Sequence, residues 1–144
     1  MIDIAGFERD FTAWIATQLD MTVDTDIFRA AIPTGVAQGA CVRVESEIPD
    51  YRIHFPRFDV QILFKGARDT LWQYVADLRN ITPRYGIDIS EDYKAVSIVP
   101  NGDAMPYQAA DGGVLREFLS LHFFVQVVAK QQQEEQDNGE SGQQ

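Results

Sequence analysis

The chain of 144 residues has one cysteine, two histidines and few basic residues, and each scarcity excludes a class of structure or function. With Cys41 as the only cysteine, no disulfide can form within the chain. His54 and His122 have no cysteine or second histidine at ligand spacing, so we expect no imidazole-bound metal and no cofactor. For His122, which stands within a strand-like segment, a packed or interface role is favoured over a role as ligand or base.

Positive charge is scarce as well. The chain has 12 Lys and Arg residues against 22 Asp and Glu residues, which gives a formal net charge of −10. Sequence-specific binding to nucleic acid and docking on anionic membranes both require clustered cations, so we expect neither. The charge is compatible with a protein that lines a channel for DNA, because repulsion from the phosphates would prevent sticking.

Long apolar runs are also missing. No segment approaches the roughly 18 apolar residues that a membrane-spanning helix needs. Residues 1–5 contain neither a basic region nor an apolar run, so we expect no signal peptide and synthesis in the cytoplasm.

The sequence does contain enough apolar material for a core, at 45% hydrophobic and 11% aromatic residues. We expect one domain over residues 1–129. From residue 130 the chain is rich in Gln and Glu and has no large apolar residue, which predicts a disordered acidic tail over 130–144, or a helix that continues only in an assembly.

The clearest local pattern lies in residues 58–78. Residues 58–64 alternate between apolar and polar side chains, which predicts a half-buried strand, and Gly66 ends it. Leu71, Tyr74, Val75 and Leu78 then share one face of an amphipathic helix. The segment is a structural unit and contains no catalytic cluster.

Similar patterns predict a helix over residues 3–19 and a second one over 68–80. Strands are expected over residues 26–32, 40–46, 57–65, 93–99, 105–108 and, longest of all, 118–127. Turns at residues 100–103 and 111–113 join the late strands, and no regular alternation of strands and helices is present. The fold class is therefore α+β, a mostly antiparallel sheet of about four to six strands with two main helices packed on one face.

The last strand has two different faces. Leu119, Leu121, Phe123, Val125 and Val127 form a fully apolar face, and the opposite face is half apolar. Such a strand is either central in the sheet or buried against a partner chain. We predict that copies of the chain contact one another through a sheet edge and this half-apolar face, with the free edge offered by the last strand or by the strand over 40–46. The candidate interface residues are Phe118, His122, Phe124 and Val128, with Cys41 and Arg43 on the strand over 40–46.

No convergent catalytic set emerges, and we expect no enzymatic activity. Cys41 has no neighbouring base for nucleophilic catalysis. Asp24, Asp26 and the acids of residues 88–92 have the pattern of solvated loop carboxylates. The glycines of residues 35–40 precede a strand, whereas a phosphate-binding loop leads into a helix.

The order and spacing of several segments resemble small phage tail terminators, also described as minor capsid or tail completion proteins. Residues 58–78 resemble the strand–glycine–helix unit of that family. The other similar segments are an early strand ending in Pro33, a second strand after a glycine-containing loop, and a closing hairpin with a long final strand (residues 26–33, 40–44 and 104–128).

The resemblance implies a virion tail protein that assembles in the host bacterium's cytoplasm as a homo-oligomeric ring, typically a hexamer. Its implied partners are the tail tube protein and the head–tail connector protein. The implied task is to end tail polymerisation and form the joint to the head. Three alternatives remain open at this stage: another tail or neck component, a small enzyme or ligand-binding domain, and a non-catalytic acidic adaptor.

Overall fold

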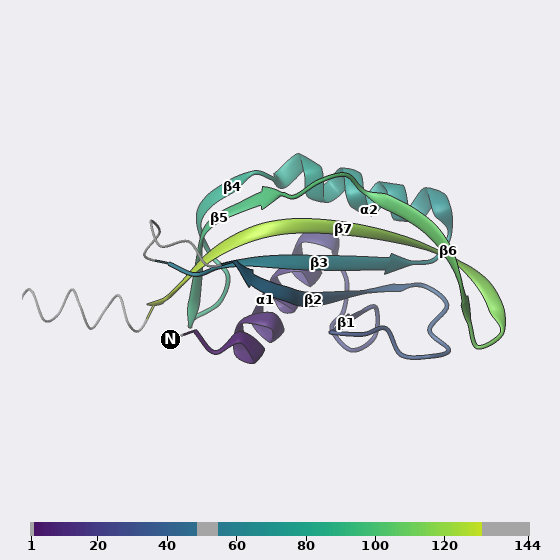
Figure 1. Cartoon of the computed structure of the whole chain (residues 1–144). Helices are drawn as coiled ribbons and strands as arrows, with labels where there is room; N and C mark the ends of the chain where they lie inside the picture. Colours follow the sequence, from purple (N-terminus) through teal and green to yellow (C-terminus); the bar gives the residue numbers. More distant parts are fainter. Residues whose placement is uncertain (1, 49–54, 131–144) are drawn as a thin grey trace, which may run out of the picture.

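The computed structural model describes residues 2–48 and 55–130. These residues form two helices and seven strands, and the strands make up one sheet (Figure 1). In chain order the elements are α1 (Ile4–Leu19), β1 (Ile27–Arg29), β2 (Gly39–Ile48), β3 (Arg57–Lys65), α2 (Arg68–Ile81), β4 (Arg84–Asp88), β5 (Tyr93–Pro100), β6 (Met105–Asp111) and β7 (Val114–Ala129).

Both helices cover the same face of the sheet. The ring of Phe7 in α1 stacks on Phe58 of β3 with centroids 5.6 Å apart. In α2, Tyr74 stacks on Phe64 of the same strand at 5.3 Å. Phe58 and Phe64 point the same way because side chains alternate along a strand. The core therefore lies between the sheet and one helical layer, and the expected α+β class with two helices on one face is confirmed.

The sheet has the strand order β1-β2-β3-β7-β5-β4, and β6 pairs with the first half of β7. Only the β1–β2 pair is parallel. Strand β7 is central, since residues 118–126 pair with β3 on one edge while the other edge pairs with β6 and β5. This agrees with the central position expected for the last strand. The suggestion that this strand offers a free edge to a neighbour is wrong over these residues.

Several strand boundaries differ from the sequence-based expectations. Strand β4 was missed because Pro83 and Gly86 have the pattern of helix and strand breakers. Here Pro83 precedes the strand, and Gly86 has a φ of 62°. Pro is tolerated at the start of an edge strand. Strand β1 is shorter than expected, while β2, β6 and β7 are longer, and the sheet has seven strands.

Lys130, directly after β7, is held against the end of β4 and the turn that follows it. The backbone N–H of Lys130 donates to the carbonyl of Asp92 at 2.9 Å, and its Nζ lies 3.0 Å from Asp88 Oδ1. Residues 131–144 of the tail predicted over 130–144 lie outside the described residues, as does His54. Neither described helix combines the length and apolarity needed to cross a membrane.

Candidate interaction surface on the open sheet face

Among residues 2–48 and 55–130, no helix packs on one of the two faces of the sheet, and we call this face the open face. The strand registers show which side chains lie on this face, because along each strand they alternate with side chains that point into the core. The open face is formed by Cys41, Arg43, Arg57, Asp59, Gln61, Leu63, Phe118, Ser120, His122, Phe124, Gln126 and Val128. All six candidate interface residues are thus on one face, as their alternation predicted.

Strand pairing sets their spacing on this face. Arg43 lies opposite Gln61, which lies opposite His122, so the two candidates belong to one row across three strands. Phe124 lies between Asp59 of β3 and Val99 of β5. Val128 lies at the far end of β7 and is only 8% exposed. The six residues therefore form an extended surface rather than a compact site.

A hydrogen-bonded chain of polar side chains crosses the middle of the open face. Ser120 Oγ lies 3.3 Å from His122 Nε2, and His122 Nδ1 lies 3.1 Å from Asp59 Oδ1. Gln61 Nε2 donates to Ser120 Oγ at 2.9 Å, and Asn101 Nδ2 donates to Asp59 Oδ1 at 3.4 Å. The pattern of the sequence singled out His122 but none of these four partners. One signal was available, because Ser120 and His122 are two apart and share a face.

The order Ser–His–Asp raises the question of nucleophilic catalysis. Acyl transfer also needs fixed donors for the oxyanion and a cleft for the substrate. In the described part of the chain, the hydrogen-bond partners of Ser120 Oγ are the side chains of Gln61 and His122. These groups satisfy one another, as polar groups on a half-covered surface require. We interpret this hydrogen-bonded row of side chains as a preorganised polar patch.

Aromatic residues flank this patch on both sides along β7. Phe118 stacks on Tyr107 of β6 with centroids 5.4 Å apart. The guanidinium of Arg57 lies 5.2 Å from the ring centroid of Phe124, within cation–π range. Both phenylalanines are consequently half-buried in the isolated chain. The open face thus combines aromatic anchors with a polar centre, a composition typical of protein–protein interfaces.

Cys41 was expected on a partly covered face, and the structure buries it, with 1% of its surface exposed. Burial raises the pKa of its thiol to about 11, although the nearby Arg43 cation acts in the opposite direction. The thiol is therefore protonated at neutral pH. Burial and the neighbouring Cys41 raise the pKa of Tyr107 as well. The side chain of Cys41 lies on the side of the open face, but neighbouring residues cover it and it is not accessible there.

A buried ion pair lies at one end of the open face. Lys65, the last residue of β3, is only 2% exposed, and its Nζ pairs with a carboxylate oxygen of Asp111. Asp111 ends β6, and Gly112 and Gly113 follow with φ values of 61° and 82°, the left-handed region that favours glycine. The pair joins the end of the β6–β7 hairpin to the sheet.

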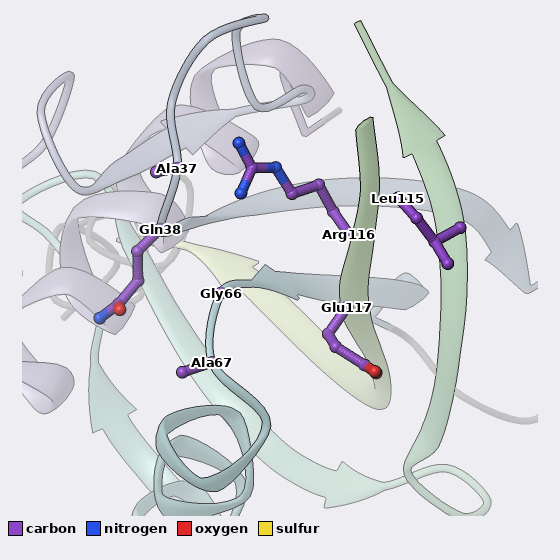
Figure 2. Close-up of a pocket in the computed structure, with 7 residues that line it drawn as sticks. All are labelled: Ala37, Gln38, Gly66, Ala67, Leu115, Arg116 and Glu117. Carbon is purple, nitrogen blue, oxygen red and sulfur yellow. The ribbon is translucent and has the colours of Figure 1, made fainter. Parts of the chain in front are cut away.

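A cavity of about 320 Å³ lies beside this hairpin, between the chain before β2 and the turn from β3 into α2. Figure 2 shows Arg116 extending toward Ala37, while Leu115 points to the other side of β7. The lining residues are Ala37, Gln38, Gly66, Ala67, Leu115, Arg116 and Glu117. They form no cluster of catalytic type. Across residues 2–48 and 55–130, no group of three or more His, Cys, Asp or Glu side chains is placed to hold a metal ion.

Comparison with known proteins gives a likeness among solved structures. No protein-family model matches the chain, and a search of curated proteins found no match. Among solved structures, the chain is similar to a protein chain from the virion of a native gene transfer agent (GTA) particle. The TM-score is 0.55 at 16% sequence identity, and the match covers 88% of this chain and 98% of that chain. At this identity the likeness shows a shared fold.

Proposed function

We propose that this protein is a structural component of a phage-like virion that caps the tail tube as a homo-oligomeric ring. The observation that carries the proposal is the fold likeness to a chain of a gene transfer agent virion, which extends over 98% of that chain. The resemblance of the segment order to tail terminators supports the finer assignment. The ring would end tail polymerisation and form the joint to the head connector.

The surface of the molecule supports a role in assembly. An open face with aromatic anchors around a satisfied polar centre suits contact with another protein. A contact between different surfaces of neighbouring copies closes into a ring when the rotation between them permits. The net charge of −10 suits a bore through which DNA passes, because it repels phosphate. Phe118, His122, Phe124 and Arg43 remain the candidate contact residues of this proposal. Cys41 and Val128, the other two candidates, are buried, at 1% and 8% exposed, and support the face from within.

The proposed role involves no catalysis and no cofactor. The partners are copies of the chain itself, six in all by analogy to the family, together with a tail tube protein and a head–tail connector protein. Assembly would take place in the cytoplasm of the bacterial host, and the mature location would be the virion tail.

Negative-stain electron microscopy of the purified protein, alone and with tail tubes, tests the proposal. We expect closed rings of one size alone and one such ring at a tube end in the mixture. Tubes of unlimited length formed by the protein alone would assign it to the tube proteins instead. A protein that is monomeric both alone and with tubes would contradict the proposal.

A further inference from the structure

The hairpin of β6 and β7 extends beyond the rest of the sheet, and we call residues 105–117 the arm. Strand β3 ends at Lys65, opposite Phe118, so residues 114–117 of β7 pair with β6 alone. Figure 1 shows the hairpin extending past the end of β3 and bending toward the side of the β1–β2 connection, and Asp111 next to its turn pairs with Lys65 at the end of β3. Residues 108–117 therefore extend beyond the end of β3, while residues 105–107 pair with the part of β7 that also pairs with β3.

Exposed apolar side chains gather on this arm. The exposed fractions are 60% for Met105, 42% for Tyr107, 49% for Val114 and 65% for Leu115. Large exposed hydrophobic residues elsewhere in the described chain, such as Val23, are scattered over other elements. Met105, Tyr107 and Val114 lie on the side of the open face, and Leu115 lies on the opposite side, because side chains alternate along the paired strands. Scattered apolar residues are normal on a surface, whereas exposed apolar residues on both sides of one hairpin indicate an interaction site.

The arm is nearly neutral in a strongly acidic chain. From residue 105 to 115 its only charged side chain is Asp111, which pairs with Lys65. Arg116 and Glu117 then contribute opposite charges. Two copies that each have a net charge of −10 repel one another, so they approach most favourably through a surface without net charge. This charge distribution favours a second copy of the chain as the partner of the arm.

The arm is also held in place before any partner arrives. The Lys65–Asp111 pair joins its end to the sheet, and the stack of Tyr107 on Phe118 joins its base to the open face. In addition, the backbone N–H of Gly66 donates to the carbonyl of Glu117 at 3.2 Å. A preorganised element loses little conformational entropy on binding, which favours association.

We propose that the arm packs on a neighbouring copy of the chain and is a principal contact between subunits. The inference rests on the proposed function, because it locates the contact that would close the ring. The arm of one copy meets a different surface of the next, as a closed ring of more than two subunits requires.

The experiment compares three exposed-site variants by light-scattering mass at equal protein concentration. Leu115→Glu places a charge on the arm, and Leu115→Ser removes the apolar contact without adding charge. Val23→Glu is the matched control, since Val23 is 41% exposed and lies away from the arm, between α1 and β1. Far-UV circular dichroism and the melting temperature verify that each variant folds.

We expect Leu115→Glu to weaken assembly at least tenfold, Leu115→Ser to weaken it less, and Val23→Glu to leave it unchanged. If wild type assembles and both Leu115 variants assemble as strongly as wild type, the arm is not the contact between subunits, while the proposed function stands. If wild type is monomeric at every concentration, the proposed function fails and the inference fails with it. Equal weakening by Val23→Glu would also overturn the inference, because charge alone would then explain the effect.

Discussion

The ion pair between Lys65 and Asp111 makes the sharpest prediction about stability. Lys65 is 2% exposed, so removing its carboxylate partner leaves a buried ammonium group without compensation. Breaking a buried pair from one side costs about 3–5 kcal/mol. Because the Asp111 side chain is 22% exposed, we take the lower end, about 3 kcal/mol, for Asp111→Asn. In a domain of this size that corresponds to a melting temperature lower by roughly 10 °C.

The matched variant is Lys65→Met, which removes the buried charge and keeps much of the side-chain volume. Replacing a buried charge by an apolar group of similar shape is often neutral or stabilising, so we expect a change within about 1 kcal/mol. Adding Asp111→Asn to Lys65→Met should then cost little, because no buried charge remains to be paired. The asymmetry between the two single variants is the signature of a desolvated lysine.

Urea unfolding measures these free energies at one fixed protein concentration, since assembly would otherwise add to the apparent stability. The dependence of the unfolding free energy on urea should be equal in all variants, so that midpoints compare directly. The reasoning is refuted if Asp111→Asn unfolds within 1 kcal/mol of wild type, or if Lys65→Met is destabilised as much as Asp111→Asn.

Three further predictions concern the open face and the chain end. Phe124→Asp adds a carboxylate opposite Asp59 and should lower the mass in light scattering; an unchanged ring would contradict the proposed interface. Because the pKa of Cys41 is raised from 9.0 to about 11, its contribution to stability is fully present below pH 9 and is lost as the pH rises to 11. The free-energy difference between wild type and Cys41→Ala should fall by about 2–3 kcal/mol over that range, and a constant difference would refute this. Deleting residues 131–144 should leave the melting temperature unchanged, whereas a large drop would show that the tail supports the fold.

Local patterns in the sequence were sufficient to predict most of the fold. Alternation in residues 58–64 and helical spacing in 71–78 reflect burial against a single face, and the structure has β3 and α2 at these positions. Strand β4 was not predicted, because four of its five residues are exposed and its sequence therefore shows no alternation of buried and exposed positions. An edge strand forms through pairing with a neighbour, here β5, and this pairing is not encoded in its own side chains.

The open face was predictable only in part, for a related reason. Alternation along β7 identified Phe118, His122 and Phe124 as sharing a face. The contact between His122 and Asp59 depends on the register of two strands about 60 residues apart, which the pattern of either strand alone does not determine. The burial of Cys41 likewise depends on distant segments, since the backbone of Ile32 contacts its thiol and Tyr107 lies close to it.

The mass of the purified protein in solution tests the central claim most directly. If the protein forms a closed ring, light scattering should give one discrete mass that is a multiple of the 16.2 kDa chain and does not grow with concentration. For a hexamer, six times 16.2 kDa is about 97 kDa. A mass of 16.2 kDa at every concentration and in the presence of tail tubes would contradict the account.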